Sequence, residues 1–497
     1  MNIPEIITKK RDGHELTPAE IAYIINGYSS APTTASTPPT AETPTPAPTP
    51  TTDYQMAAFL MAVFFRGMTP PELTAYTAAL VNSGKTLTWE NIPGTVVDKH
   101  SSGGVGDKTT LIVAPIAAAA GLYMPKMSGR GLGFTGGTID KLNSIPGFNT
   151  ALTTKQLAAQ TARIGLAIVG QTEELTPADG KIYALRDVTA TVDSIPLIAA
   201  SIMSKKIAGG AACIVLDVKA GSGAFMKTEE EARHLADTMV SIGENMGRRV
   251  KAVVSPMDEP LGNKVGNALE VEEAIKTLIG EGPRDLTELS LNLAANLIYL
   301  AENEKTAKPA AQSTTEEAIK TAYQKAEHLL KSGKAYEKFL QMVKQQEGDP
   351  NYIEKIANAK IAQADPTTGT PPAQATPAPA TTPAQTPTTA TTNPPENNAC
   401  NIATLTTVKA AHTATINSSK SGTLVMLDAL QIGKAAALLG AGRLKKEDTI
   451  DHAAGIIIHT KKGHPVKQGS PILTLLTNQQ NTLKEAIIEA QKSITIT

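Results

Sequence analysis

The amino-acid sequence predicts an α/β protein that carries a small β-rich unit at its carboxy-terminal end. From Gly94 to about Gly262, short β-branched runs alternate with helical patterns, which is typical of parallel strands joined by helices. Two segments, 29–52 and 365–397, consist almost entirely of Thr, Pro, Ala and Ser. Because they have too few apolar residues to offset the entropy of ordering, we interpret both as flexible inserts biased toward polyproline II.

The amino-terminal region is predicted to be helical on both sides of the first insert. One helix covers Thr17–Tyr28, and another begins near Asp53. The entropic cost of a loop grows slowly with its length, so we expect the fold to tolerate this insert.

The central region supplies the strands and helices of the α/β fold. Thr95–Val97 predicts a short strand, Lys108–Ala120 an apolar helix and Ile214–Val218 a buried strand. Thr228 and Glu231 have the spacing of a capping box, which predicts the start of a further helix.

The last third of the chain predicts helices followed by short strands. Several helices are expected within 284–345, and strands around turns at Thr423–Met426 and 463–477. A lipoyl or biotinyl carrier domain would present a lysine between two methionines at a hairpin tip, and this unit has no such triplet. We therefore expect a small mixed domain there.

Composition excludes several classes of protein. The formal net charge of -1 provides no long-range field for nucleic acid or an anionic membrane. The two cysteines, Cys213 and Cys400, make neither a disulfide framework nor a four-ligand zinc site, and Cys213 is interpreted as a core thiol. The sequence shows no signal peptide and no apolar run of about 20 residues, so we expect a cytoplasmic protein.

The strongest local signal is the glycine-rich segment Asp98–Thr110, between a predicted strand and a predicted helix. Glycines let backbone amides approach a ligand closely, and the unpaired amides of a helix start favour an anion. Its glycines and side-chain donors are Gly103, Gly104, Gly106, Lys99, Ser101 and Thr110. The spacing matches neither the Walker nor the dinucleotide pattern. Taken alone, the segment fits a phosphate loop and a plain strand-to-helix turn equally well.

A second glycine-rich segment, 125–142, favours the phosphate interpretation. A strand is predicted to end near Lys126 and Ser128, and Thr138 opens a helix. Two such loops at the carboxyl ends of strands in one sheet can converge on one tetrahedral dianion.

The third informative segment contains a predicted helix that begins after Ser194 as its cap and ends at Gly209. Ser201 and Lys205 are four residues apart and share one face. The alternative for Lys205 and its neighbour Lys206 is a simple interaction with the helix dipole.

Arg186 precedes a TATV stretch that is predicted to be extended. A binding role and a structural ion pair with Asp187 or Asp193 are both compatible with this position.

These segments resemble the thymidine/pyrimidine-nucleoside phosphorylase family. The motifs DKHSSGGVGDKTTL, KMSGRGLGFTGGTIDKLNSIPGF, ALRDVTATVDSIPLIAASIMSKKIAGGA and IVLDVKAGSGAFMK match it in order and spacing. The resemblance covers nearly the whole chain apart from the two inserts. It implies a helical domain, a large α/β domain with a mainly parallel or mixed sheet, a cleft between them that closes on substrate, and a homodimer formed through the helical domain.

The implied domain organisation is discontinuous. The helical domain would comprise 1–89, with the insert at 29–52, and 179–210, whereas the α/β domain would comprise 90–178 and 211–364. The insert at 365–397 would then lead to a carboxy-terminal α+β domain at 398–497.

The implied activity is reversible phosphorolysis of pyrimidine nucleosides, in salvage or catabolism, to a free base and a (deoxy)ribose 1-phosphate. By the resemblance, phosphate would be bound by Lys99, Ser101, Thr110, Ser128 and Thr138, with Lys126 beside it. The nucleoside would be bound by His100, Arg186, Ser201 and Lys205, with Leu132, Tyr183 and Phe225 as apolar walls. His100, Arg186 and Lys205 would be catalytic because negative charge develops on the departing base, and His100 would act there as hydrogen-bond donor or acid. Breaking this bond requires no metal or organic cofactor.

Lys126 bears on which substrates are accepted, and Phe134 differs from the residue that is usual in the family. Lys126 stands where members that accept both uridine and thymidine carry lysine and strict thymidine phosphorylases tend to carry methionine, so we favour both substrates. A strict thymidine phosphorylase is the alternative. Phe134 replaces a histidine that is usual in the second loop, with modest consequences expected.

A second departure concerns potassium. Some relatives bind this ion near the first loop, at positions that correspond here to Gly106, Lys108, Leu261, Lys264 and Glu273. Lys108 and Lys264 stand where small uncharged residues are usual. Either an ammonium group replaces potassium as the partner of Glu273, or both lysines point to solvent while their carbonyls still bind the ion.

Two rival functions are weaker. An anthranilate-type phosphoribosyltransferase would need a pyrophosphate and magnesium site, and the set of Arg186, Ser201 and Lys205 argues against it. A non-catalytic nucleoside-binding protein would show affinity without release of free base.

Overall fold

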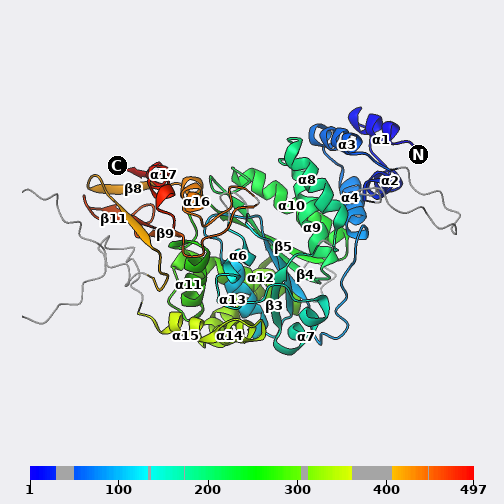
Figure 1. Cartoon of the computed structure of the whole chain (residues 1–497). Coiled ribbons are helices and arrows are strands. Elements are labelled where there is room, and N and C mark those ends of the chain that lie inside the picture. The colour runs from blue at the N-terminus through cyan, green and yellow to red at the C-terminus, as the bar shows by residue number, and fades with distance from the viewer. Residues whose placement is uncertain (30–49, 132–135, 173, 304–311, 361–405, 446) are drawn as a thin grey trace, which may run out of the picture.

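The computed structural model describes residues 1–29, 50–131, 136–172, 174–303, 312–360, 406–445 and 447–497. Most of the first predicted insert and all of the second lie outside these residues, as do Leu132, Phe134 and Cys400. Figure 1 shows three regions in a row: a helical region at the amino terminus, a central α/β region and a carboxy-terminal region of short strands and two helices. The predicted fold class is confirmed.

The helical region combines two stretches of the chain. Its helices are α1 (Ile3–Arg11), α2 (Pro18–Ser29), α3 (Asp53–Arg66), α4 (Pro70–Asn82), α8 (Pro177–Val188) and α9 (Ile195–Ala208). Helices α2 and α3 confirm the two predicted amino-terminal helices. Helices α1 and α4 were not predicted, although Thr69 and Glu72 form a capping box at the start of α4 that the sequence displays.

The α/β region is built on parallel strands. Strands β1 (Val97–Ser101), β4 (Cys213–Ala220) and β5 (Arg249–Pro256) form one sheet in the order β1-β4-β5, and β2 (Met124–Ser128) pairs with β3 (Leu166–Gly170). A parallel bridge between Val96 and Tyr123 links the two sheets. The strand predicted at Thr95–Val97 therefore begins two residues later and continues to Ser101, because β1 follows β4 in register.

Strand β4 shows how this region is held together. Cys213 and Val215 are buried in the core around α5 (Thr109–Ala119), whereas Ile214 and Leu216 are buried in the core shared with the helical region. A parallel strand that is covered on both faces has a continuous run of apolar residues in its sequence, and this run made β4 predictable. The core position of Cys213 is likewise confirmed.

The remaining helices surround the sheets. They are α6 (Thr138–Leu142), α7 (Thr154–Ile164), α10 (Glu229–Asn245), α11 (Asn267–Leu278), α12 (Arg284–Glu302), α13 (Gln312–Lys331), α14 (Lys334–Gln345) and α15 (Pro350–Asn358). Helix α10 begins with the predicted capping box of Thr228 and Glu231, and α12 to α14 confirm the helices predicted within 284–345. Among the described helices, none combines the length and the apolar character that crossing a bilayer requires.

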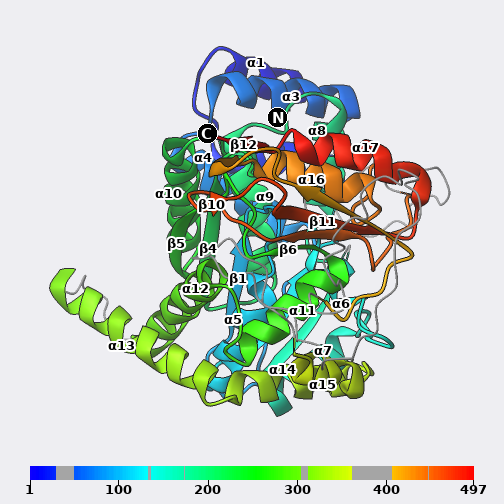
Figure 2. The same ribbon diagram turned by 90° about the vertical axis from the view of Figure 1, so that its left-hand side faces the viewer.

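The carboxy-terminal region contains β7 (His412–Asn417), β8 (Gly422–Leu427), α16 (Ala429–Leu438), β9 (Gly455–Ile458), β10 (Pro465–Val466), β11 (Pro471–Thr477), α17 (Gln480–Gln491) and β12 (Ile494–Ile496). One of its sheets has the order β6-β9-β11-β7, and its first strand, β6 (Lys264–Gly266), comes from the central part of the chain. Figure 2 shows β6 beside the orange and red strands of this region. Strand β6 thus joins the carboxy-terminal region to the segment that follows β5.

Candidate active site

The two glycine-rich segments and helices α8 and α9 line one cleft of about 560 Å³. Strands β1 and β2 end at this cleft, as expected for parallel strands that present a ligand site at their carboxyl ends. The predicted residues that line it are Lys99, His100, Ser101, Thr110, Lys126, Ser128, Thr138, Tyr183, Arg186, Ser201, Lys205 and Phe225. The fold therefore brings together every predicted ligand-binding residue except Leu132, which lies outside the described residues.

The first glycine-rich segment is organised around Asp107, which sequence analysis did not single out. The Asp107 carboxylate accepts hydrogen bonds from the Ser101 hydroxyl, from the Thr109 hydroxyl at 2.6 Å and from the Thr109 backbone N–H at 3.1 Å. Burial raises the pKa of Asp107, but Lys99, Lys219 and Lys141 outweigh it and hold the pKa well below the usual value. A carboxylate thus occupies the Ser101 hydroxyl, one of the donors that phosphate was predicted to use.

Lys99 lies at the bottom of this side of the cleft and is almost completely buried. Its Nζ donates to Thr109 Oγ1 at 2.6 Å and is 3.7 Å from Asp217 Oδ2. Asp217 also pairs with Lys219 at 2.8 Å. Burial lowers the pKa of Lys99, and the nearby Asp107 and Asp217 oppose that effect. The Lys99 ammonium is therefore held in place by the protein interior.

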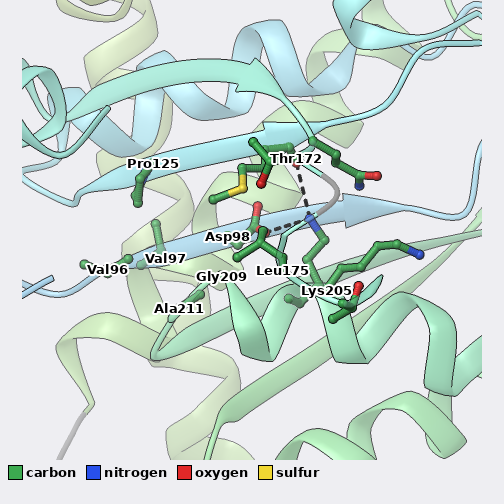
Figure 3. A pocket seen from close by; sticks show the side chains of 13 residues that line it. Val96, Val97, Asp98, Pro125, Thr172, Leu175, Lys205, Gly209 and Ala211 are labelled. Atoms are coloured by element: carbon green, nitrogen blue, oxygen red, sulfur yellow. Dashed lines mark hydrogen bonds and ion pairs between the residues drawn. The ribbon is translucent and has the colours of Figure 1, made fainter. Parts of the chain in front are cut away.

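A second buried group joins β1, β2 and α9. The Asp98 carboxylate is 3.0 Å from Lys126 Nζ and 2.8 Å from Lys206 Nζ. Burial raises the pKa of Asp98, yet the two ammonium groups lower it to about 2, whereas burial lowers the pKa of Lys126 to about 7. Figure 3 shows Asp98 among the residues of a small pocket that it lines together with Lys205 of α9. Lys206 is buried in this pair and does not act only through the helix dipole.

On the opposite side of the cleft, Asp179 of α8 organises the predicted base-binding residues. It accepts hydrogen bonds from Ser201 Oγ at 3.0 Å and from Lys205 Nζ. Ser201 and Lys205 do share a face of α9, with Lys205 Nζ 3.2 Å from Ser201 Oγ. Asp179 was missed because it lies 22 and 26 residues earlier, on another helix. Ser194 stands at the predicted start of α9, but its side chain makes no capping hydrogen bond there.

Arg186 is buried, and its guanidinium binds backbone carbonyls. It donates to the carbonyls of Thr191 at 3.2 Å, Val192 at 2.7 Å and Leu197 at 3.1 Å. The stretch predicted to be extended is a turn that folds around this side chain, with Ala190 at φ +54°. Arg186 is therefore positioned by carbonyl groups, and its hydrogen bonds do not go to Asp187 or Asp193. Burial lowers its pKa.

His100 is half-buried at the end of β1, between the two sides. Burial, followed by the charges of Lys206 and Lys126, lowers the pKa of His100 well below 6.5. A neutral imidazole can donate one hydrogen bond but does not carry the extra proton of an acid. The electrostatics favour the donor role of the two that were predicted.

The second glycine-rich segment is held by a residue from the carboxy-terminal region. Arg443 makes two hydrogen bonds to Asp140 of α6, at 2.8 and 2.9 Å, and one to the Gly131 carbonyl at 3.2 Å. Asp140 also accepts from the Gly131 N–H at 2.7 Å and pairs with Arg130 at 3.2 Å. Nothing local in the sequence indicated this contact, because Arg443 and Asp140 are 303 residues apart.

The residues of the predicted potassium site lie together at the back of the first glycine-rich segment, which itself contributes Gly106 and Lys108, and none of the five lines the cleft. Among the described residues, no group of three or more His, Cys, Asp or Glu side chains is placed to bind a metal ion.

Three family patterns match the chain. The helical bundle domain of a glycosyl transferase family matches residues 4–84, the a/b domain of the same family matches 93–336, and the pyrimidine nucleoside phosphorylase C-terminal domain matches 423–497.

The chain is similar over its full length to proteins named pyrimidine-nucleoside phosphorylase. The chain is 44% identical over 496 residues to a pyrimidine-nucleoside phosphorylase of Bacillus subtilis, and 42% identical over 499 residues to one of Staphylococcus epidermidis. Both comparisons cover 100% of this chain and 96% of the relative. A solved anthranilate phosphoribosyltransferase from Thermus thermophilus matches with a TM-score of 0.51 at 17% identity, covering 69% of this chain and 99% of that one. This last likeness concerns the fold.

Proposed function

Because the chain belongs to the pyrimidine-nucleoside phosphorylase family, we propose that it catalyses reversible phosphorolysis of uridine, thymidine and deoxyuridine, in pyrimidine salvage or catabolism. The observation that carries the proposal is the cleft itself. Two glycine-rich loops with buried lysines face Arg186, Ser201 and Lys205 across it. This arrangement suits an anion on one side and a planar polar base on the other.

The proposed chemistry uses these two sides together. A phosphate oxygen forms a bond to C1′ while the bond from C1′ to the base nitrogen breaks, and the electron pair of that bond passes to the base. Phosphate is already an anion, so the enzyme needs to position it and not to deprotonate it. The sugar carbon becomes oxocarbenium-like, as in other glycosyl transfers.

The departing base needs donors where negative charge develops. Arg186 and Lys205 supply positive charge there, Ser201 bonds to the N3 edge, and His100 donates toward O2. Of these, Arg186 is already positioned by three backbone carbonyls. Lys205 and Ser201 are bound to Asp179, so we propose that they turn part of their hydrogen bonding to the base when substrate enters.

The breadth of substrates is proposed to depend on Lys126. Its ammonium lies in the cleft beside Ser128 and is oriented by Asp98 at 3.0 Å. A pKa of about 7 leaves N–H donors on Lys126 in either protonation state, so a bond to a ribose 2′-hydroxyl is available. A strict thymidine phosphorylase is the second candidate.

The experiment is phosphate-dependent release of free base from uridine, thymidine, deoxyuridine and cytidine, assayed side by side. Release from both uridine and thymidine, absent without phosphate, is the expected result. Release from thymidine alone would favour the strict enzyme. Nucleoside binding without any release would favour a binding protein. Base release from uridine 5′-monophosphate with pyrophosphate and magnesium, but from no nucleoside with phosphate, would favour a phosphoribosyltransferase.

The variant Lys126→Met sharpens the test of breadth. A hydrogen bond from a charged group is worth about 1.5–3 kcal/mol, so kcat/KM for uridine should fall roughly 10- to 100-fold. Deoxyuridine lacks the 2′-hydroxyl and should change less. Equal losses for both substrates would contradict the assigned contact.

A homodimer through the helical region is part of the proposal. Helix α3 exposes Tyr54, Phe64 and Phe65, with Tyr54 and Phe65 each 75% exposed, and aromatic groups of this kind are typical of interfaces. Sedimentation velocity of the full chain and of Phe65→Glu tests it, with a dimer expected for the first and a shift toward monomer for the second. The cytoplasmic location stays a prediction.

A further inference from the structure

The side chain of Lys108 ends in an enclosed group of oxygen atoms behind the first glycine-rich segment. Lys108 directly precedes α5, and its side chain is 0% exposed. Its Nζ donates to the Leu261 carbonyl at 3.0 Å, the Lys264 carbonyl at 2.7 Å and Glu273 Oε2 at 2.6 Å. An ammonium group has three N–H donors, so this set of acceptors uses all of them.

Both oxygens of the Glu273 carboxylate also accept hydrogen bonds from the protein. Its Oε1 accepts from the Asn263 N–H at 2.8 Å, and its Oε2 accepts from the Lys264 N–H at 3.2 Å in addition to Lys108. A buried charge is costly unless it is both paired and hydrogen-bonded, and both conditions are met for this pair. The group is therefore complete without any further ligand.

The Leu261, Lys264 and Glu273 oxygens belong to three of the five positions that the family resemblance implies for potassium. The residues present do not fit the ion, because Lys108 Nζ already takes the Leu261, Lys264 and Glu273 oxygens. The alternative in which both lysines point to solvent is wrong: Lys264 is also buried, and its Nζ pairs with Glu272. Only Lys108 thus occupies the cation position.

We propose that the Lys108 ammonium is a built-in monovalent cation, so that the protein needs no potassium. This proposal rests on the proposed function only where activity is measured.

The position of Lys108 gives this cation a structural task. Gly106, at φ +74°, brings the loop so close to the Leu261 carbonyl that a Cβ would lie 2.6 Å from it. Lys264 begins β6, which pairs with β9 of the carboxy-terminal region. One ammonium therefore links the phosphate loop, the 261–264 segment and α11. Asp107, the neighbour of Lys108, holds Ser101, so Lys108 acts as a positioning residue for the phosphate side.

The first arm of the test measures activity with and without potassium. Phosphorolysis of uridine is assayed with tetramethylammonium or potassium as the only monovalent cation, at equal ionic strength. The wild-type rates should agree within about twofold. Lys108→Ser empties the oxygen group, so its rate should fall at least about tenfold without potassium and recover with saturating dependence on potassium, as expected when binding restores the active state.

Lys276→Ser is the matched control. Lys276 has the same kind of acceptors, Glu281 at 2.8 Å and the carbonyls of Ala357 and Ala359 at 3.0 and 2.7 Å, but it lies away from the cleft. The activity of the Lys276→Ser protein should be equal with potassium and with tetramethylammonium. A dependence on potassium in this variant would mean that any buried lysine gives the same result, which would overturn the proposal.

The second arm measures melting temperature and does not depend on the reaction. Wild-type protein should melt at the same temperature in potassium and in tetramethylammonium, whereas Lys108→Ser should melt higher in potassium. A wild-type requirement for potassium, or a wild-type melting temperature raised by it, would overturn the proposal. So would a Lys108→Ser protein that is fully active in both buffers.

The two arms also separate the two proposals. If Lys108→Ser does not fold, the proposal is decided by the wild-type protein alone, from its activity and melting temperature in potassium and in tetramethylammonium. If no base is released in either buffer, the proposed function fails, and the melting experiment still tests the built-in cation.

Discussion

The two sides of the cleft hold their positive charges differently. On the phosphate side, Lys99 is 1% exposed and lies in a network with Thr109, Asp107 and Asp217. On the base side, the Lys205 side chain is 28% exposed and lies beside Tyr183 and Phe225, which are 45% and 48% exposed. The Lys99 ammonium is thus part of the protein interior, whereas the Lys205 ammonium is open to the cleft, although Arg186 on the same side is as buried as Lys99. The difference teaches that a buried cation is fixed before substrate enters, whereas an exposed cation can turn from Asp179 toward the base.

The largest effect is expected for Lys99→Met. It removes a buried counter-charge from Asp107 and Asp217, which should lower the free energy of unfolding by about 3 kcal/mol. Loss of the ammonium should also reduce kcat/KM by roughly 10²–10³. Urea unfolding and steady-state kinetics measure the two. The surface pair of Lys85 with Glu174 provides a control, because Lys85→Met should cost less than about 1 kcal/mol. A Lys99→Met protein as stable as the wild type would show that burial does not distinguish Lys99 from Lys205.

Lys205→Met should lose rate with a smaller loss of stability. The expected fall in kcat/KM is again roughly 10²–10³, because a donor to the departing base is removed. The free energy of unfolding should fall by about 1–2 kcal/mol, less than for Lys99→Met, because Lys205 is 28% exposed and the buried Asp179 keeps the hydrogen bond from Ser201. Urea unfolding measures the change in stability, and steady-state kinetics measures the change in kcat/KM. A loss of stability equal to that of Lys99→Met would show that the two sides do not differ.

Arg443→Met tests whether the carboxy-terminal region supports only the phosphate side. Its two bonds to Asp140 are partly buried, so we expect KM for phosphate to rise about 5- to 10-fold with KM for nucleoside unchanged. Arg130→Met is the control, because Arg130 contacts the same carboxylate but is 59% exposed. Equal effects on both KM values would assign Arg443 to the fold as a whole.

The smallest effect concerns His100, where the two sides meet. Its pKa in the folded protein is lower than 6.5, so the unfolded chain binds more protons as the pH falls below 6.5. This group's contribution to stability is therefore complete above pH 6.5 and decreases below it, by at most about 1.4 kcal/mol per pH unit. His100→Asn should flatten the dependence of unfolding free energy on pH between 6.5 and 5. An unchanged slope would mean that His100 titrates normally.

Local patterns predicted the parts of this protein that local physics determines. The apolar run of β4 and the capping box of α10 are patterns of neighbouring residues. The shared face of Ser201 and Lys205 follows from the helical period. Helix α4 was within reach by the same reasoning, through Thr69 and Glu72. The family resemblance added the gathering of these residues at one cleft.

Some local predictions were wrong because a residue outside the predicted stretch decided the outcome. The TATV stretch has β-branched residues that favour extended backbone, but the buried Arg186 guanidinium gathers the carbonyls of Thr191, Val192 and Leu197 around itself. The strand predicted at 95–97 shifted because pairing with β4 set its register.

The sequence by itself determined which residue types are available: lysines and hydroxyls on glycine-rich loops, and a serine and lysine on one helical face. Only the tertiary structure decided which carboxylate or carbonyl each cation meets. Lys206 and Asp98 are 108 residues apart, Lys108 and Glu273 are 165 apart, and Arg443 and Asp140 are 303 apart. Periodicity reports on neighbours within one helix or strand. An ion pair between such distant residues exists only after the core has packed, and the energy of each pair depends on the burial that packing creates.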